Sequence, residues 1–370
     1  MPRPIVITGG GTGGHLFPMR AVADALTARG VSPGDLRFVG SRRGQEAALL
    51  GDGAVSLTRL PGRGLRRSWR GPDVAANVGA VAGLGVALVR ATALVARWRP
   101  AAVVSVGGYA SFATSAAAVL CRRPLVLVDL DATPGAAHRL LARFAARRCV
   151  AYDDGTGAAV TGAPVRASLL DVDRSSDARR RARAAQVEPI DDGRTVVVVM
   201  TGSLGAARVN DAVSELAQIW SARNDRTLVH VAGRRDYERV RSRRPAVAAL
   251  DYRILSFADM AELWAVCDVA VCRAGATTVA EVTALGVAAV LVPLPGAPDD
   301  HQGRNARVLA DAGAAFVLAD ATCTGAALAA VLDDVAAPER REAMEAAAAR
   351  LGRRDAADAV ALVVLEASRS

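Results

Sequence analysis

The sequence contains one local pattern twice: a short apolar run, then a glycine-rich turn, then a segment with the composition of a helix. The first copy joins residues 5–7 (IVI) to the turn 8–15 (TGGGTGGH), and the second joins residues 196–200 (VVVVM) to the turn 201–205 (TGSLG). A strand, a glycine turn and a helix in this order open a doubly wound α/β domain. The pattern therefore predicts two such domains in one chain.

The rest of the chain supports this prediction, because short apolar runs alternate with Ala- and Leu-rich helical segments. Further strands are expected at residues 36–39, 102–106, 125–128, 227–231, 268–272 and 288–292. Continuous apolar strands are buried on both faces of their sheet, which is typical of parallel sheets covered by helices. A chain of 370 residues also exceeds what one core usually organises. We therefore expect an α/β fold of two domains, with the polar stretch 171–193 as the connector.

The formal net charge is +9, and every basic residue is Arg. This excess fits either a solvated surface or an attraction to anions, such as nucleotide phosphates or an acidic membrane face. The run 179–183 (RRRAR) is interpreted as a solvated helix face, and no nucleic-acid partner is expected. The five cysteines form no CxxC pair, which indicates reduced thiols in a cytosolic protein. We expect neither a signal peptide nor a membrane-spanning run of about 20 apolar residues.

The first glycine turn is the most specific candidate site. Glycines let the backbone turn sharply and approach a ligand, and the N-terminus of the following helix favours anions. His15 lies where the turn enters the helix, at the carboxyl edge of the sheet, where open α/β sheets bind ligands. A capping or buried histidine is the alternative, but the five preceding glycines favour a functional role.

Three further turns follow expected strands. Residues 273–281 (RAGATTVAE) would offer backbone amides and hydroxyls to a diphosphate and Glu281 to a ribose, although an ordinary helix cap explains them equally well. Residues 293–306 (PLPGAPDDHQGRNA) carry polar side chains that suit sugar hydroxyls, or they form a plain surface loop. Residues 107–111 (GGYAS) form a tight turn in the first domain, where Tyr109 either packs or contacts an acceptor.

Together and in this order, these motifs resemble those of the MurG family of GT-B glycosyltransferases. Residues 9–15 followed by Pro18, and then residues 107–109, match the family's two N-terminal glycine motifs. Residues 161–166 (TGAPVR) look like the family's Thr-Gly-Asn-Pro-Val-Arg, with Ala163 in place of Asn. The remaining matches extend the resemblance over nearly the whole chain: residues 202–206 (GSLGA), Asn210, residues 273–281 and residues 300–306.

The resemblance implies two Rossmann-like doubly wound domains facing across a cleft. Residues 1–164 would take the acceptor, residues 165–349 would take the donor UDP-GlcNAc, and a C-terminal helix at about 350–370 would pack back on the first domain. The implied reaction joins C1 of GlcNAc to the 4-hydroxyl of MurNAc on an undecaprenyl-diphosphate lipid, with inversion and without a metal or cofactor. It implies a peripheral protein of peptidoglycan synthesis at the cytoplasmic face of the cell membrane, in contact with cell-wall assembly proteins.

The resemblance also assigns roles to individual residues. His15 becomes the candidate base, with Asp129 as a second catalytic residue. The implied donor site comprises Thr12, Gly13, Gly14, Arg166, Ser203, Phe257, Ala258, Gly275, Ala276, Thr277, Thr278, Glu281, His301 and Gln302. The implied acceptor site comprises Gly14, Tyr109, Asp129, Asp131 and Asn210.

A membrane contact is expected because the family's acceptor is embedded in lipid. A basic cluster directly precedes the uncharged segment 74–89, and this pairing suits a contact with anionic lipids. The alternative is a buried helix beside a basic loop. The cluster consists of Arg63, Arg66, Arg67, Trp69 and Arg70.

One segment departs from the family pattern. Where the family has His-Glu-Gln-Asn, this chain has Val128, Asp129, Leu130 and Asp131, so the carboxylate is shorter and two polar side chains are lost. The family's Gln-Gln pair is also His301–Gln302 here. These changes keep two alternatives open: a transferase with another lipid or small-molecule acceptor, and a non-catalytic UDP-sugar-binding paralogue. A dinucleotide-dependent oxidoreductase is disfavoured, because no ribose-binding acid follows the second strand.

Overall fold

The computed structural model describes residues 3–10, 13–41, 55–61, 72–109, 111–202 and 205–369, without the side chains at 72, 73, 75 and 76. The chain divides into two compact units. The first contains Met1–Arg166 together with Arg353–Ser370, and the second contains Ala167–Gly352. The crossing after Arg166 lies close to the boundary expected at 164/165. Each unit is described by itself below.

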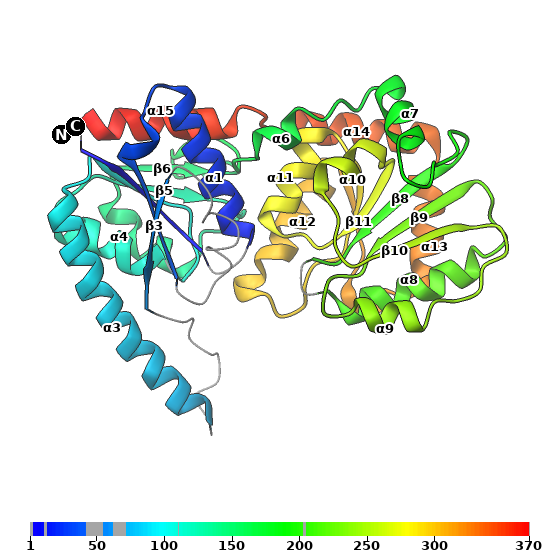
Figure 1. The fold of residues 1–370 in the computed structure, drawn as a ribbon, viewed down its shortest axis with the longest axis horizontal. Helices are drawn as coiled ribbons and strands as arrows, with labels where there is room; N and C mark the ends of the chain where they lie inside the picture. Colours follow the sequence, from blue (N-terminus) through cyan, green and yellow to red (C-terminus); the bar gives the residue numbers. More distant parts are fainter. Residues whose placement is uncertain are drawn as a thin grey trace. The chain divides into compact units, whose positions relative to one another are not determined.

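The described part of the first unit is a parallel sheet of seven strands covered by helices (Figure 1). Its strand order is β3-β2-β1-β4-β5-β6-β7. The strands are β1 (Ile5–Thr8), β2 (Leu36–Ser41), β3 (Ser56–Leu60), β4 (Ala102–Ser105), β5 (Leu125–Asp129), β6 (Arg147–Val150) and β7 (Ala159–Val160). The helices are α1 (Gly13–Ala28), α3 (Pro72–Trp98), α4 (Ser111–Leu120), α5 (Ala136–Leu141) and α15 (Ala356–Arg369).

The described part of the second unit repeats this architecture with six parallel strands in the order β10-β9-β8-β11-β12-β13. The strands are β8 (Thr195–Met200), β9 (Arg226–Val231), β10 (Asp251–Leu255), β11 (Val269–Cys272), β12 (Ala288–Leu291) and β13 (Ala315–Val317). The helices are α6 (Ala167–Leu170), α7 (Ser176–Ala184), α8 (Ala207–Ile219), α9 (Tyr237–Ser242), α10 (Met260–Val266), α11 (Ala276–Leu285), α12 (His301–Asp311), α13 (Gly325–Val335) and α14 (Pro338–Leu351).

The cores explain why the continuous apolar runs predicted these sheets. Every residue of β1, β4 and β5 is buried in the first unit, as is every residue of β11 and β12 in the second. Burial on both faces requires helices above and below each sheet. The prediction of a parallel α/β fold with two doubly wound domains is confirmed.

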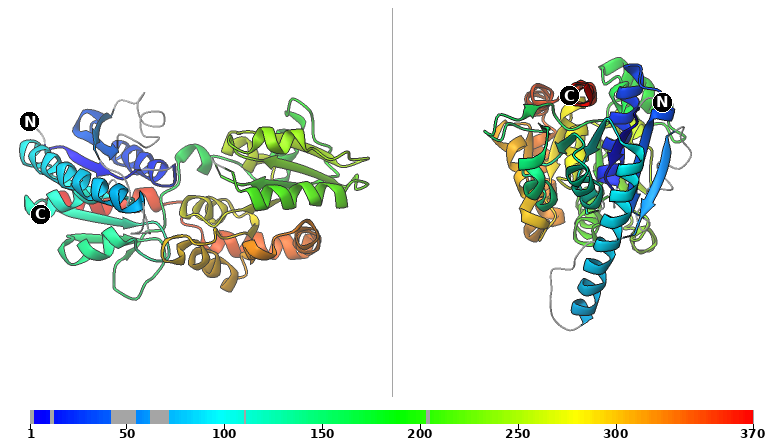
Figure 2. Two further views of the ribbon diagram at one scale, coloured as in Figure 1. Left: turned by 90° about the horizontal axis from the view of Figure 1, so that it is seen from below. Right: turned by 90° about the vertical axis from the view of Figure 1, so that its left-hand side faces the viewer.

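The C-terminal helix α15 belongs to the first unit, where it packs on α1 and reaches β4, β5 and β6. Arg29 at the end of α1 forms an ion pair with Asp358 of α15. The left-hand view of Figure 2 shows both termini of the chain in this unit. The crossing back occurs at Arg353, whose Nη1 donates to the carbonyl oxygen of Val160 (3.2 Å).

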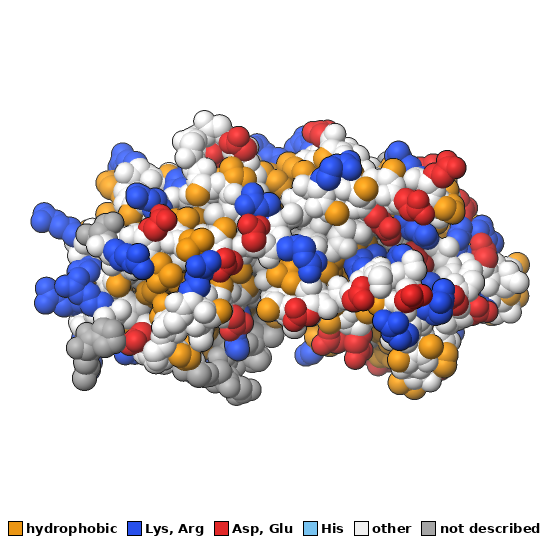
Figure 3. All heavy atoms as spheres, turned by 90° about the horizontal axis from the view of Figure 1, so that it is seen from above, with side chains coloured by type: hydrophobic (Ala, Val, Ile, Leu, Met, Phe, Trp, Pro, Cys, Tyr) orange, Lys and Arg blue, Asp and Glu red, His pale blue; other side chains and the backbone are white. Residues whose placement is uncertain are grey.

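The basic run in α7 differs from expectation, because only part of it is solvated. Arg180 and Arg181 are exposed, but Arg183 is 6% exposed and donates to Asp268 Oδ2 (2.6 Å). Arg179 donates to the other oxygen of the same carboxylate (3.2 Å). Residues four apart share one helix face, so these two arginines turn inward together. On the face drawn in Figure 3, basic and acidic side chains are interspersed.

The helix α3 also differs from expectation, because it is apolar enough to span a membrane. Its segment Asn77–Trp98 has 22 residues and a mean hydropathy of 1.9, and 22% of its most apolar window is buried. One face packs against α4 through Ala87, Ala91 and Val95. The first turns of α3 extend beyond the sheet of this unit (Figure 1). Core helices of globular proteins have the same length and composition, and α3 packs on α4 along one face.

Candidate functional site

In the first unit, two predicted motifs meet at the sheet edge. Strands β1 and β4 are neighbours, yet β1 continues to β2 on one side and β4 to β5 on the other. The loops that follow them therefore diverge at the place where open α/β sheets bind ligands. They contact each other closely: a Cβ on Gly9 would lie 2.4 Å from Val106 Cγ2, and one on Gly108 would lie 2.4 Å from the carbonyl oxygen of Gly10.

His15 lies beside this contact, as the third residue of α1. Its ring faces the turn at residues 107–108: Cδ2 is 3.5 Å from the position of a Cβ on Gly107, and Nδ1 is 3.4 Å from that on Gly108. His15, Gly13 and Gly14 are all half-buried, so the histidine is not a core residue. The structure thus places the imidazole at the carboxyl edge of the sheet, against two glycines that leave room for it.

Asp129, the second residue predicted to be catalytic, is buried in a hydrogen-bonded cluster. His138 Nδ1 lies 2.6 Å from its Oδ1, and Arg148 donates to its Oδ2 (3.2 Å). His138 Nε2 lies 2.8 Å from the hydroxyl of Ser105, the last residue of β4. Asp129 and His138 are each 4% exposed, and Ser105 is fully buried. Both carboxylate oxygens therefore bind protein groups in this conformation, and a direct contact with an acceptor would require the cluster to open.

The other residues assigned to the first unit surround the same edge. Tyr109 is half-exposed, and its hydroxyl donates to Ser41 Oγ at the end of β2 (3.2 Å). Asp131 follows β5 and is half-buried. Burial, and after it the negative charge of Asp131, raises the pKa of Tyr152. Arg166 belongs to this unit by its contacts, and its guanidinium carbon stacks 3.9 Å from the ring centroid of Phe17 on α1.

In the second unit, the equivalent divergence lies between β8 and β11. Gly205, in the turn after β8, packs closely on the turn that follows β9 and on the carboxylate of Asp236. A Cβ on Gly205 would lie 2.7 Å from the carbonyl oxygen of Ala232, and one on Gly233 would lie 2.5 Å from the amide nitrogen of Gly205. Both glycines have φ near +82°, so each is required for conformation as well as for space.

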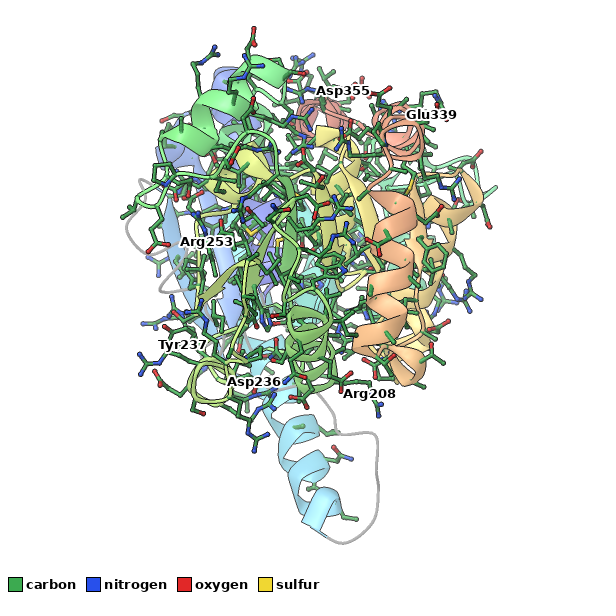
Figure 4. The ribbon with its side chains drawn as sticks, turned by 90° about the vertical axis from the view of Figure 1, so that its right-hand side faces the viewer. Arg208, Asp236, Tyr237, Arg253, Glu339 and Asp355 are labelled. Atoms are coloured by element: carbon green, nitrogen blue, oxygen red, sulfur yellow. The ribbon has the colours of Figure 1, made fainter. Side chains whose placement is uncertain are left out.

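Asn210 is fully buried beneath these turns. Its amide nitrogen donates to Asp236 Oδ2 (3.0 Å) and to the carbonyl oxygen of Ala232 (3.1 Å), and its oxygen lies 2.8 Å from His230 Nε2. Burial lowers the pKa of His230 to about 4, so this imidazole is neutral at physiological pH. Asp236, labelled in Figure 4, lies just before α9. Asn210 thus holds the glycine turns in place, and it reaches no ligand while it is buried.

The N-terminus of α11 is the clearest candidate for an anion site among the described residues of the second unit. Gly275 caps the helix, and Gly275, Ala276, Thr277 and Thr278 are half-buried, whereas the remaining residues from Val279 onward are buried. The backbone amides of this first turn therefore lie at the sheet edge, in the position from which helix N-termini bind anions. Asn305 of α12 donates to the carbonyl oxygen of Ala274 (3.1 Å) and Arg273 to that of Val292 (3.1 Å), which fixes the loop before the helix.

Two residues that were predicted to bind the UDP-sugar lie near the N-terminus of α11. Glu281 is 5% exposed, and its Oε2 accepts a hydrogen bond from Trp264 Nε1 (3.1 Å). Gln302 Nε2 lies 4.0 Å from the position of a Cβ on Gly275, and its Oε1 accepts from the amide of Leu294 (2.9 Å). Gln302 therefore lies beside the N-terminus of α11. Glu281 is buried within the same helix and holds it through Trp264.

The loop before α12, which was predicted to contact the sugar, has a strained backbone. Asp299 and Asp300 are both left-handed, with φ of 52° and 51°, although neither is glycine. Such pairs persist only when the surroundings hold them, and they concentrate at functional sites. Gly303 leaves the space that the Asp300 carboxylate occupies, and Arg307 donates to that carboxylate (3.0 Å). His301 directly follows, half-buried at the start of α12.

The expected uracil contact is an exposed aromatic ring. Phe257 is 61% exposed in the loop after β10, next to the half-buried Ala258. The guanidinium carbon of Arg234 lies 4.8 Å from the ring centroid. An exposed ring at this edge, with a cation on one side, offers a stacking surface to a base.

Several predicted residues lie outside the described part of the chain: Thr12, Ser203, Arg63, Arg66, Arg67, Trp69 and Arg70. Among the residues that are described, no group of three His, Cys, Asp or Glu side chains could hold a metal ion. Sequence reasoning missed His138, Ser105, Arg148 and Trp264. A signal existed for His138, because the chain has four histidines and this one closely follows Asp129.

Both units match models of known protein domain families. Residues 5–150 match the model of the glycosyltransferase family 28 N-terminal domain, and residues 196–360 match that of its C-terminal domain. Relatives from Alkalilimnicola ehrlichii (38% identity, 100% of both chains) and Azotobacter vinelandii (38%, 99% of both) are both named UDP-N-acetylglucosamine–N-acetylmuramyl-(pentapeptide) pyrophosphoryl-undecaprenol N-acetylglucosamine transferase. A crystal structure of Acinetobacter baumannii MurG matches with a TM-score of 0.77 and 28% identity, covering 99% of this chain and 100% of that chain.

Proposed function

Because the chain belongs to glycosyltransferase family 28, we propose that it transfers GlcNAc from UDP-GlcNAc to the 4-hydroxyl of MurNAc on undecaprenyl-diphosphate-linked MurNAc-pentapeptide. The observation that carries the proposal is full-length similarity to transferases of that name, at 38% identity. The two glycine-rich sheet edges support it, because each unit has a site at its own topological switch point. This activity would place the protein in peptidoglycan synthesis.

In this proposal the second unit binds the donor. The backbone amides of Gly275, Ala276, Thr277 and Thr278 bind the diphosphate, as helix N-termini bind phosphates. Gln302 and His301 contact the GlcNAc hydroxyls, Phe257 and Ala258 lie along the uracil, and Glu281 serves the ribose. Arg166, Ser203 and the turn Thr12, Gly13 and Gly14 add phosphate contacts. The departing UDP gains negative charge, which a helix N-terminus and Arg can stabilise. The proposal includes no metal and no other cofactor, so transfer should persist in EDTA.

The first unit binds the acceptor and supplies the base. An imidazole titrates near neutral pH, so His15 can take the proton of the attacking hydroxyl as the bond to C1 forms. Gly14, Tyr109 and Asp131 lie at the same sheet edge and contact the acceptor sugar. Asp129 acts on this chemistry from a buried position in this unit, while the buried Asn210 holds the glycine turns of the second unit.

The proposal further assigns a membrane contact to α3, at the cytoplasmic face of the membrane. Five valines of α3 are exposed, whereas Ala87, Ala91 and Val95 are packed, and the segment 74–89 carries no charge. The right-hand view of Figure 2 shows how far this helix extends from the unit's sheet. An apolar helix beside a basic segment suits anionic lipids. The exposed valines are Val74, Val78, Val81, Val86 and Val89.

The triple variant Val78→Glu/Val81→Glu/Val89→Glu should bind vesicles of phosphatidylglycerol and phosphatidylcholine at least about 100-fold more weakly. Each valine that becomes buried in the membrane contributes about 1.5 kcal/mol or more to binding, and the variant loses three of them. Vesicle co-sedimentation measures this. The matched control Val187→Glu/Ile219→Glu/Leu362→Glu carries the same charge change on exposed apolar positions elsewhere and should bind like the parent chain. Equal losses in both variants would show that charge, and not α3, decides binding.

The test of the activity is a transfer assay. Protein in detergent or lipid receives labelled UDP-GlcNAc and the undecaprenyl-linked MurNAc-pentapeptide, and both UDP release and lipid-linked disaccharide are followed. Disaccharide formation supports the proposal. Donor binding without disaccharide would instead support a different acceptor, or a non-catalytic paralogue, which the changed residues 128–131 keep as alternatives.

A further inference from the structure

Resting on the proposed function, we propose that His138 is a positioning residue for the transfer reaction. It is held by Asp129 and Ser105, and it sets the place of His15 through the turn at Gly107 and Gly108. The role comes from a buried side-chain cluster and from one shared contact.

Residues from three neighbouring strands form the cluster that holds the His138 ring. Asp129 ends β5, Ser105 ends β4, and Arg148 lies on β6. The Asp129 carboxylate accepts from Nδ1 of His138, so Nε2 accepts from the Ser105 hydroxyl in the neutral ring. Arg148 donates to the second carboxylate oxygen and also to Asp154 (2.9 Å). With Asp129 and His138 this deeply buried, the ring has little freedom to move.

The shared contact joins this cluster to His15. His138 Cε1 lies 3.7 Å from the position of a Cβ on Gly107, and His15 Cδ2 lies 3.5 Å from the same position. The two imidazoles therefore both line the space that a side chain on Gly107 would occupy. Gly107 and Gly108 have φ of +89° and +82°, and glycine by itself has no strong preference for one such conformation. Neighbouring groups must then hold the turn: Ser111 Oγ donates to the carbonyl oxygen of Gly108 (2.8 Å), and the buried His138 ring lies beside Gly107.

Ser105, His138 and Asp129 have the connectivity of a hydrolytic triad, but the geometry does not support that chemistry. Ser105 is fully buried within the sheet, where no substrate reaches its hydroxyl. A nucleophilic serine must face the scissile bond. The cluster therefore acts on the reaction through His15 rather than on a substrate.

The test is a double-mutant cycle in the transfer assay. His138→Gln should lower kcat about 10- to 100-fold, as expected for misplacement of a catalytic group, with the KM for UDP-GlcNAc unchanged. In the His15→Ala background the same substitution should change kcat less than about twofold, because groups that act as a unit are not additive. Asp129→Asn keeps the shape of the cluster and removes its charge, and it should show the same non-additivity if His138→Gln does not fold.

Leu125→Val is the matched control, because it removes a core methylene at the opposite end of β5 and should leave kcat unchanged. An unchanged kcat in His138→Gln, or an equal fall with and without His15, would overturn the inference. Those results would leave the proposed function intact if the parent chain forms disaccharide. A parent chain that forms none would overturn the proposed function itself, and this inference with it.

Discussion

Replacing His15 by Ala should lower kcat about 100- to 10 000-fold while the affinity for UDP-GlcNAc stays within error, because general base catalysis contributes this much to proton transfer. The imidazole lies at the edge of the first unit, against Gly107 and Gly108. The proposed donor contacts come mainly from the second unit, so binding and turnover should separate. Stopped-flow or radiometric turnover measures the first quantity and calorimetry the second.

The control for this variant is Arg20→Ala on the same helix. Arg20 is exposed and pairs with Asp24, four residues on (2.8 Å), so its loss should leave kcat unchanged. Added imidazole should restore part of the turnover of His15→Ala, because the deleted side chain leaves space beside the glycine turn. A His15→Ala protein that turns over at the parent rate would remove His15 as the base and would leave the fold and the donor site untouched.

Gly108→Ala should unfold the first unit more easily and abolish most turnover. A left-handed φ of +82° costs an alanine about 1–2 kcal/mol. Its Cβ would also lie 2.4 Å from the carbonyl oxygen of Gly10, so one of the two loops must move, at a further cost of about 1–3 kcal/mol. Displacement by even 1 Å at this site should lower kcat about 100-fold. Thermal unfolding and the transfer assay measure the two effects.

Gly30→Ala separates strain from contact. Gly30 has a φ of +93° at the end of α1, and nothing lies within 4 Å of its Cβ position. This variant should therefore lose only the conformational part of the stability and keep its turnover. Equal stability losses in Gly30→Ala and Gly108→Ala, with equal kcat, would mean that the close approach of the two loops is unimportant.

Much of the candidate site could be predicted from short segments of the sequence. The glycine turns, the start of α11 and the position of Gln302 all follow strands, and each could be recognised because a buried strand and its turn are local patterns. The same reasoning failed for α7 and α3. In α7 it did not predict that Asp268 draws Arg179 and Arg183 inward. For α3 it predicted the uncharged segment 74–89, but not an apolar stretch long enough to span a membrane.

The buried polar residues show why local patterns have this limit. Asp129 and Asn210 carry side chains suited to a ligand, and their motifs place them at the right sheet edges. In the structure both face protein partners that are distant in sequence, such as Arg148 for Asp129 and His230 for Asn210. Whether a polar side chain faces a ligand or another side chain depends on those partners.

The sequence by itself determined the two parallel sheets, the paired glycine turns and the family, because strand burial and turn chemistry are encoded in neighbouring residues. Only the tertiary structure decided that His15 and His138 lie next to the same turn, at Gly107. That contact exists because β4 lies between β1 and β5, which brings together residues 15, 107 and 138. Strand order is set by the packing of the whole sheet, and no short segment carries it.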